Sequence, residues 1–324
     1  MEYNIIKCHG SGNDFLLFDL MTCEPFVSDV EWASTAITLC NRITGIGADG
    51  ILLVENSEFA DAKMRIFNAD GSEASMCGNG LRCVTRFVGE KLNKTTMTIE
   101  TMKKNLATAI TIKNGLVTYN VEISPISFCT ADLPMITELD EVFNLPLPQL
   151  AENLKFTAVA VPNPHLIAII EGNIDTAQQV ALAKKVNAEN KWFPDGVNVS
   201  FVKVLKPGEI FVQTFERGVG LTNACGTAMS AASLVTNKLG YHGQNKQIVV
   251  YTPSGVSVSC TILSDQVILA GNATYEFNST IHYNHENNSW KITNQHFHQH
   301  EVDQFQQMKE QVRKIIQIDQ LLKG

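Results

Sequence analysis

The sequence predicts an α/β protein built from two similar halves, in each of which a central helix follows a Cys-Gly pair. Cys77 and Cys225 each lie ten residues after a phenylalanine, Phe67 or Phe215, and each is followed by glycine. The residues between phenylalanine and cysteine are mostly polar and include glycine, as in a loop. Since internal self-similarity indicates a repeat, these two segments predict a duplicated domain.

A helix is predicted directly after each cysteine. Apolar residues recur with helical spacing after Cys77, at Leu81, Val84, Phe87, Val88 and Leu92. The same spacing follows Cys225, at Met229, Ala232, Val235 and Leu239. Gly240 then supplies a residue typical of a helix C-terminus.

Strand-like segments follow both predicted helices. In the first half, residues 95–101 run into a β-rich segment with a turn at Asn114-Gly115, and residues 116–123 follow. Asn-Gly is among the strongest hairpin signals. The matching series in the second half is 247–252, 256–262 and 266–270, with turns at Pro253-Ser254-Gly255 and Ser264-Asp265. The order of strand, loop, Cys-Gly, helix and strands is therefore shared by the two halves.

The repeat places the boundary between the halves in the stretch from Pro125 to Pro148. We expect an N-terminal half over 1–123, joined by a return strand at about 268–280, and a C-terminal half over 124–267. Residues 281–324 form an extension outside the repeat. Its last part, 302–322, predicts an amphipathic helix whose apolar face holds Phe305, Met308, Val312, Ile315 and Leu322. That face could pack on the body of the protein or on a second subunit.

Composition indicates an ordinary globular protein. Of its 324 residues, 44% are hydrophobic and 18% are charged. The net charge of −8, with no stripe of Lys and Arg, argues against nucleic-acid binding. The N-terminal residues show no secretory signal, and no segment has the apolar length of a membrane span. We therefore expect a cytoplasmic protein.

The eight cysteines include no C-x-x-C pair, so neither a structural zinc site nor any other metal site is expected from them. In the cytoplasm such thiols stay reduced, and most would serve as small core residues. Cys77 and Cys225 differ because each lies where a loop becomes a helix. A helix N-terminus offers backbone N–H groups and partial positive charge, which lowers a thiol pKa and binds a carboxylate.

Two such thiols, one from each half, suit inversion of a carbon stereocentre. One removes the α-proton as a thiolate, and the other delivers a proton to the opposite face as a thiol. The helix N-termini could stabilise the developing negative charge. From spacing alone, two buried packing cysteines are an equally good interpretation, because the repeat shows symmetry and not the reaction.

At these residues the sequence resembles the diaminopimelate epimerase family, over almost all of 3–275. The resemblance rests on seven motifs in the family's order, which are the segments 7–15, 45–50, 67–83, 161–165, 195–199, 215–220 and 224–227. The Met-Cys-Gly-Asn-Gly form around Cys77 is similar to this family, whereas the related proline racemases carry His where Asn79 stands. The resemblance implies two similar α/β domains, each a central helix wrapped by mostly antiparallel strands, with a catalytic cleft between them.

The resemblance also implies roles for the matching residues. Cys77 and Cys225 would be the two bases, with His165 and Glu216 helping to set their protonation. The substrate would be held by the side chains of Asn13, Asn68, Asn163, Asn198, Glu216 and Arg217. Its α-carboxylate would bind the backbone of Gly78, Asn79, Gly226 and Thr227. Arg217 can grip a carboxylate with two parallel hydrogen bonds, and asparagine amides match an ammonium beside a carboxylate.

Several positions depart from the family's usual pattern. Leu221 stands where the family usually has an acid, and Ala228-Met229 stand where it usually has Gly-Ala. Asn272 replaces the more usual proline near the end of the second half. None of these is an assigned catalytic residue, but each could alter the wall of the substrate pocket.

The histidine-rich segment near the C-terminus is a separate candidate. Alternating His296, His298 and His300 would share one face of a strand and could bind a metal, although a polar surface segment is the favoured interpretation. No glycine-rich dinucleotide fingerprint follows a strand, and no lysine stands in a context that suggests pyridoxal phosphate. We therefore expect no cofactor and no metal.

The sequence thus predicts a cofactor-independent two-base epimerase that interconverts LL- and meso-2,6-diaminopimelate for lysine and peptidoglycan precursor synthesis. Its partner would be a small amino-acid substrate, with neither nucleic acid nor membrane involved, and the assembly is expected to be a homodimer. Two alternatives are a racemase of another amino acid on the same scaffold and an inactive amino-acid-binding homologue.

Overall fold

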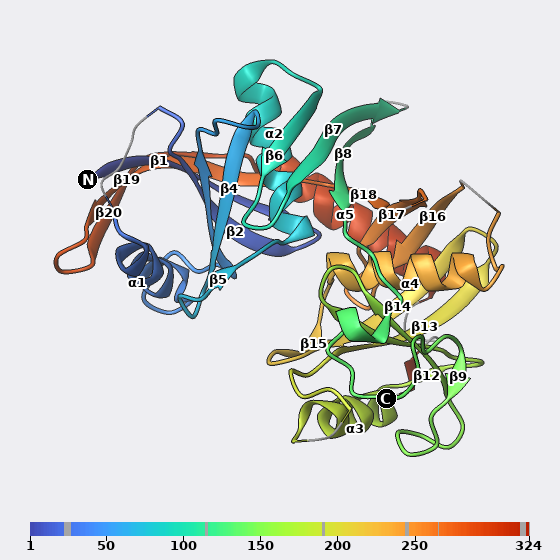
Figure 1. Cartoon of the computed structure of the whole chain (residues 1–324). Helices are drawn as coiled ribbons and strands as arrows, with labels where there is room; N and C mark the ends of the chain where they lie inside the picture. Colours follow the sequence, from blue (N-terminus) through green and yellow to red (C-terminus); the bar gives the residue numbers. More distant parts are fainter. Residues whose placement is uncertain are drawn as a thin grey trace. The chain divides into compact units, whose positions relative to one another are not determined.

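The computed structural model describes residues 1–22, 27–113, 116–189, 192–243, 246–264, 266–317 and 322–323. The chain divides into two compact units (Figure 1). Unit 1 comprises Met1–Val121 and Ala270–Gln307, and unit 2 comprises Glu122–Leu269 and Met308–Gly324. The extension after residue 280 is thus divided between the two units.

Unit 1 begins with a hairpin and builds a sheet around one long helix. Its elements are β1 (Glu2–Gly10), β2 (Asn13–Asp19), α1 (Asp29–Cys40), β3 (Gly50–Glu55), β4 (Ala62–Asn68), β5 (Glu73–Ala74), α2 (Gly78–Leu92), β6 (Thr96–Glu100), β7 (Asn105–Lys113), β8 (Leu116–Ile123), β19 (Thr274–Asn284) and β20 (Ser289–Phe297). Helix α2 contacts β1, β2, β3, β4, β6 and β7. It is therefore the central helix that the strands surround.

Unit 2 repeats this order. Its elements are η1 (Thr130–Asp132), β9 (Leu145–Pro146), β10 (Lys155–Ala160), β11 (Pro164–Ile169), β12 (Ile174–Asp175), α3 (Thr176–Asn187), β13 (Asn198–Lys206), β14 (Glu209–Glu216), β15 (Gly220–Thr222), α4 (Gly226–Lys238), β16 (Gln247–Tyr251), β17 (Ser257–Ile262), β18 (Val267–Gly271) and β21 (Leu322–Lys323). Helix α4 contacts β10, β11, β13, β14, β16 and β17. The predicted α/β duplication is confirmed.

Strand pairing shows how closely the units correspond. β2 pairs parallel with β3, and β11 pairs parallel with β13. β4 pairs antiparallel with β3 and parallel with β6, while β14 pairs antiparallel with β13 and parallel with β16. In each unit the central helix connects two parallel strands, which are β4 and β6 in unit 1 and β14 and β16 in unit 2. The N-terminus of the helix therefore lies at the equivalent place in both units.

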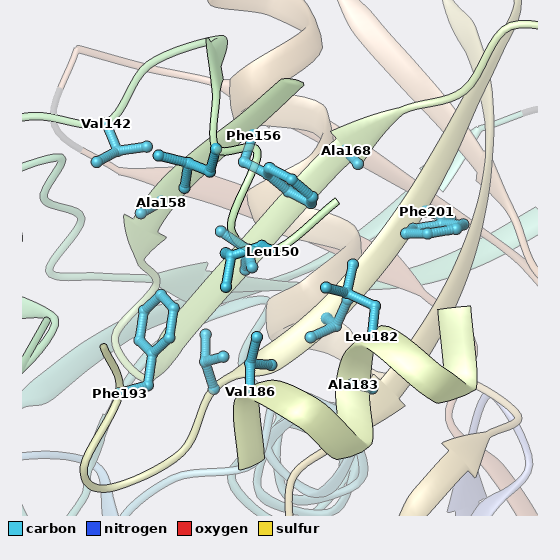
Figure 2. Close-up of a cluster of buried hydrophobic side chains, with 14 of the residues drawn as sticks. Val142, Leu150, Phe156, Ala158, Ala168, Leu182, Ala183, Val186, Phe193 and Phe201 are labelled. Atoms are coloured by element: carbon cyan, nitrogen blue, oxygen red, sulfur yellow. The ribbon is translucent and has the colours of Figure 1, made fainter. Parts of the chain in front are cut away.

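The core of unit 2 contains apolar side chains from the strands and from α3 (Figure 2). Leu182, Ala183 and Val186 recur with helical spacing on the face of α3 that points to the sheet. Phe156 of β10 and Phe201 of β13 are fully buried beside them. Burying a phenylalanine side chain contributes about 1.5–3 kcal/mol relative to leaving it exposed.

The extension contains a helix, α5 (Gln299–Ile316), but its predicted bounds and face need correction. The helix ends before Leu322, which belongs to the short strand β21, parallel to β12. Ile315 is 71% exposed, whereas Ile316 is buried with Phe305 and Val312. Successive residues of a helix are rotated by about 100° around its axis, so Ile316 lies within roughly 20° of Phe305 and on the same face. Ile315 lies on the side of the helix, away from that face.

The predicted turn at Asn114-Gly115 lies outside the described residues, as does Asp265 of the predicted Ser264-Asp265 turn. The flanking strands β7 and β8 pair antiparallel as expected. The predicted turn at Pro253-Ser254-Gly255 is present, because the Gly255 N–H donates to Thr252 O at 3.0 Å. Among the helices that the structure describes, none is long and apolar enough to cross a membrane.

Candidate active site

Cys77 and Cys225 occupy the same position in the two units. Cys77 is the N-cap of α2 and Cys225 is the N-cap of α4, and both have extended backbone geometry. Neither helix has an acidic residue in its first turn, so the partial positive charge of each N-terminus is not offset there. Each cysteine is thus placed beside a helix end that suits an anionic group.

In unit 1, Asn13 is directed at Cys77. The Cys77 thiol donates to Asn13 Oδ1 at 3.7 Å, and Asn79 Nδ2 donates to the same oxygen at 3.2 Å. Asn13 Nδ2 in turn donates to Asp49 Oδ2 at 2.6 Å, which fixes which end of the amide faces the thiol. The predicted residues Asn13, Cys77 and Asn79 therefore form one cluster.

Asn68 lies at the end of β4 in the same unit and is exposed. Its Nδ2 donates to Ser72 Oγ at 3.0 Å, inside the loop that leads to Cys77. The next residue, Ala69, donates its N–H to Asp49 O at 2.9 Å. Asn68 is therefore connected to the Asn13 cluster through the backbone of Asp49. Gly78, which begins α2, is buried.

An ion-pair network supports Asp49. The Arg42 guanidinium lies 2.7 Å from a carboxylate oxygen of Asp14 and 2.7 Å from one of Asp49. Lys7 Nζ lies 2.5 Å from Asp14. Burial of Asp14 works against its charge, but hydrogen bonds and charges from Arg42 and Lys7 prevail and lower its pKa to about 2. Asp14 therefore stays ionised, and Arg42 ties it to the carboxylate that orients Asn13.

In unit 2, the Cys225 side chain is nearly enclosed, with 8% of the residue exposed. Burial raises the pKa of this thiol well above its ordinary value, and the negative charge of Glu216 raises it further. The Thr227 hydroxyl, 3.4 Å from Sγ, acts in the opposite direction. The expectation that the helix N-terminus leaves a low thiol pKa is therefore wrong for Cys225, because desolvation prevails. Gly226 is buried at the start of α4.

The other predicted residues of unit 2 gather at one end of three neighbouring strands. His165 of β11 is the register partner of Asn198 of β13. Asn198 Oδ1 accepts the backbone N–H of Arg217 at 3.0 Å. Arg217 directly follows Glu216, the last residue of β14. The Arg217 side chain is exposed, and its Nη1 donates to Asp195 O at 2.7 Å, which holds the guanidinium in place.

His165 is fully buried, and its ring Nε2 lies 2.9 Å from Asn163 Oδ1. Burial lowers the pKa of His165 to about 3, and the positive charge of Arg217 contributes to the shift. The imidazole is therefore neutral near pH 7, and its Nε2–H donates to Asn163 in the tautomer that fits this contact. Within the described residues, Nδ1 has no hydrogen-bond partner.

We predict that His165 makes the fold sensitive to acid. Its pKa is about 3 in the fold against an ordinary value of 6.5, so below pH 6.5 the unfolded chain takes up a proton that the folded chain does not. Stability therefore falls as the pH is lowered between these values. His165→Gln should reduce the dependence of the free energy of unfolding on pH by about 1.4 kcal/mol per pH unit. Urea unfolding between about pH 6 and pH 4 measures this dependence. The exposed His300→Gln is the control, and parallel curves for His165→Gln and wild type would contradict the prediction.

Three polar residues of unit 1 that the sequence did not single out belong to the Cys77 cluster. Asp49 orients Asn13, Arg82 supports Asn79, and Ser11 accepts a hydrogen bond from the same guanidinium. Arg82 Nη2 donates to Ser11 Oγ at 2.8 Å and to Asn79 Oδ1 at 2.7 Å. All three lie inside the motifs that indicated the family, but their spacing alone carries no information on which side chain they contact.

The histidine segment does not form the strand face that was predicted. Strand β20 ends at Phe297, so His300 falls in the first turn of α5. The rings of His296 and His298 lie 5.2 Å apart, and His298 Nε2 lies 2.9 Å from Asn278 Oδ1. No group of three or more His, Cys, Asp or Glu residues suited to a metal ion occurs in the part of the chain that the structure describes.

Comparison with known sequences identifies what this arrangement resembles. The profile of the family described as diaminopimelate epimerase matches residues 5–123 and 157–275, one segment in each unit. A diaminopimelate epimerase of Clostridium acetobutylicum is 44% identical over 289 residues, covering 87% of this chain and 86% of that protein. A protein of the same name from Listeria welshimeri is 46% identical over 289 residues, covering 86% of this chain and 88% of that protein.

Solved structures share the fold at low sequence identity. A phenazine biosynthesis protein of the PhzF family from Bacillus anthracis has a TM-score of 0.61 at 17% identity, covering 85% of this chain and 97% of that one. A hydroxyproline epimerase from Agrobacterium vitis has a TM-score of 0.56 at 13% identity, covering 86% of this chain and 92% of that one. At such identity these two structures support the fold alone.

Proposed function

This chain belongs to the diaminopimelate epimerase family, and from that premise we propose that it interconverts LL- and meso-diaminopimelate without a cofactor, using Cys77 and Cys225 as its two acid/base groups. The observation that carries the proposal is the equivalence of the two cysteines. Each is the N-cap of the central helix of its own unit, in a segment that the family profile matches.

Inversion without a cofactor has specific requirements that the two cysteines and the two helix N-termini are proposed to meet. A base must remove the α-proton from one face of the carbon, and an acid must supply a proton to the other face. The developing negative charge needs fixed positive potential, which the first-turn N–H groups of α2 and α4 can provide to the α-carboxylate. Gly78, Asn79, Gly226 and Thr227 are the first-turn residues whose backbone is proposed to bind it.

The burial of Cys225 suggests the protonation state from which the reaction starts. Because burial and Glu216 raise its pKa, Cys225 is proposed to be the thiol of the resting enzyme. For the isomer whose α-hydrogen faces it, Cys77 gives up to solvent the proton that it donates to Asn13 Oδ1 and then acts as the thiolate base, while Cys225 gives its proton to the opposite face. After that turnover Cys77 carries the proton, and Cys225 is the base for the reverse direction.

Recognition of diaminopimelate requires a second amino-acid head to be bound without reaction. We assign this task to the polar cluster of unit 2, in which Asn163, Asn198 and Arg217 lie near His165 and Glu216. The neutral His165 holds the Asn163 amide, and Asn198 holds the backbone of Arg217. Asn13 and Asn68 are the proposed contacts from unit 1.

The experiment that tests the function is turnover of LL-diaminopimelate in deuterium oxide with no added cofactor. We expect the meso isomer, with one solvent deuterium at the inverted α-carbon. Turnover of another amino acid but not diaminopimelate would keep the mechanism and replace the substrate. Ligand binding with no hydrogen exchange for any amino acid would refute the epimerase proposal and identify a binding protein.

The biological setting is proposed from the family and the composition. The reaction would supply lysine and peptidoglycan precursor synthesis in the cytoplasm. A homodimer is the proposed assembly, and sedimentation of the purified full chain would distinguish it from a monomer.

A further inference from the structure

The tight turn between β1 and β2 carries Asn13 to the Cys77 thiol. Gly10 and Asn13 are register partners, so Ser11 and Gly12 form a two-residue turn. Both have positive φ, 59° at Ser11 and 82° at Gly12, which is the left-handed geometry that such hairpin turns require. A side chain is uncommon in this region, so contacts around Ser11 must stabilise it. We call residues Gly10–Asn13 the Asn13 turn.

One side of the Asn13 turn is supported from α2. A Cβ at Gly10 would lie 2.6 Å from Asn79 O, so the turn approaches the helix backbone more closely than a side chain would allow. Arg82 donates to the hydroxyl of Ser11, and Asn79 donates to Asn13. These contacts belong to the active-site cluster already described.

The other side of the turn is covered by the first turns of α5. Phe305 is buried with 6% exposed, and its ring centroid lies 4.3 Å from that of His9, which directly precedes the turn. A Cβ at Gly12 would lie 4.0 Å from Phe305 Cζ, so the phenyl ring faces the turn itself. Phe305 therefore occupies the space into which the turn would otherwise relax.

The start of α5 is fixed to the rest of unit 1 by one carboxylate. The Arg86 guanidinium of α2 binds Glu301 through two bonds, of 2.5 and 2.8 Å. Glu301 Oε2 also accepts the backbone N–H of Tyr275 at 3.1 Å. The same guanidinium lies 3.5 Å from the centre of the Tyr275 ring and donates to Ala273 O at 2.8 Å. The two-bond geometry fixes an orientation for α5, which a single surface ion pair would not.

The segment between the second half and the extension contributes a further contact. Asn272 Oδ1 accepts the backbone N–H of Ser11 at 3.1 Å. Its Nδ2 donates to Thr274 Oγ1 at 2.8 Å, which sets the direction of the amide. This is the position at which the chain departs from the family's usual proline. A proline side chain offers no acceptor, so the contact to Ser11 depends on this substitution.

We propose that the extension positions the catalytic site, with Phe305 of α5 as the residue that holds the Asn13 turn against Cys77. Glu301 keeps α5 in place, and Asn272 holds the strained residue Ser11. The inference rests on the proposed function for its meaning in catalysis, but the packing that carries it lies entirely within unit 1. Phe305 is a positioning residue, because it acts on the thiol through Asn13.

The test compares Phe305→Ala with Phe305→Leu, which keeps most of the apolar volume, and with Gln306→Ala, an exposed neighbour on the same helix. Two readouts are used on the full chain. One is the rate at which iodoacetamide alkylates Cys77, followed by peptide mass spectrometry with the exposed Cys129 as the internal reference. The other is the separate kcat and KM for LL-diaminopimelate.

In Phe305→Ala we expect the alkylation rate of Cys77 to change at least about threefold, with that of Cys129 unchanged. We also expect kcat/KM to fall about 10- to 100-fold, since small misplacements of reacting groups cost rate on this scale. Phe305→Leu should recover most of the wild-type alkylation rate and most of the wild-type kcat/KM, and Gln306→Ala should match wild type in both. Glu301→Gln, which weakens the anchor without opening a cavity, should shift both readouts in the same direction by less.

Folded Phe305→Ala and Glu301→Gln proteins with wild-type alkylation of Cys77 and wild-type kcat/KM would overturn the proposal. If Phe305→Ala fails to fold, Glu301→Gln still decides, because wild-type alkylation of Cys77 and wild-type kcat/KM in that variant would overturn the proposal. If the wild-type protein does not epimerise diaminopimelate, the proposed function fails, while the alkylation rates still report whether α5 controls the surroundings of Cys77.

Discussion

Each single cysteine variant is expected to lose epimerisation while keeping hydrogen exchange on one isomer. Cys225→Ala retains Cys77, which can still remove and return a proton on its own face of the α-carbon. Cys77→Ala retains Cys225, which can do the same on the opposite face. The loss of inversion should be about 10²–10⁴-fold or more, the usual contribution of a positioned acid or base. Incubating LL- and meso-diaminopimelate separately in deuterium oxide measures both quantities.

The two variants should exchange opposite isomers, and this complementarity is the distinctive result. It follows from the proposed mechanism, in which each thiol acts on one face of the carbon. Cys129→Ala, which removes an exposed thiol elsewhere, should behave as wild type. Exchange of the same isomer by both variants would mean that only one thiol acts on the carbon, and would contradict a two-base mechanism.

The fold could be predicted because both copies of the repeat contain local sequence patterns that indicate their helices and strands. Helices α2 and α4 begin directly after Cys77 and Cys225, where the spacing of apolar residues placed them. The strands after each helix were predicted from alternation and turn residues. Such signals depend only on neighbours along the chain. Because the chain is duplicated, the same pattern occurs twice, and each copy supports the prediction made from the other.

The extension was harder to predict because its structure depends on distant residues. Leu322 continues the apolar pattern of the preceding helix, yet it lies in β21, paired with β12. A two-residue strand has no local pattern, so only its partner near residue 174 determines it. His300 similarly continues an alternation from the preceding strand, but α5 begins at Gln299. In both cases tertiary contacts override a local periodicity.

The identities of the candidate site residues came from the family's motifs, while their environment could not be predicted. The clustering of Asn163, His165 and Asn198 depends on the parallel register of β11 and β13. The raised pKa of Cys225 depends on how deeply the thiol is buried beside Glu216. Helix position alone suggested the opposite direction, because desolvation is not visible in a sequence.

Replacing Arg217 by lysine is expected to weaken diaminopimelate binding about 10- to 100-fold, with a smaller effect on kcat. A hydrogen bond to a charged group contributes about 1.5–3 kcal/mol, and lysine cannot form the two parallel bonds of a guanidinium. Arg217 is suited to the distal carboxylate because its Nη1 is already held by Asp195 O and its side chain is exposed. Binding energy from a non-reacting head appears mainly in KM.

The role of Arg217 is separated from a general structural effect by an analogue that lacks the distal carboxylate. Lysine has the reacting head, the chain and the distal ammonium of diaminopimelate, but no second carboxylate. Wild type should bind diaminopimelate far more tightly than lysine, and Arg217→Lys should lose most of that preference, because the change removes the partner of the missing group. Lys206→Ala, which removes an exposed cation of the same unit, should keep the preference. Equal weakening of both ligands by Arg217→Lys would show that Arg217 serves the reacting head or the fold, and would leave discrimination of the distal head to the asparagines around it.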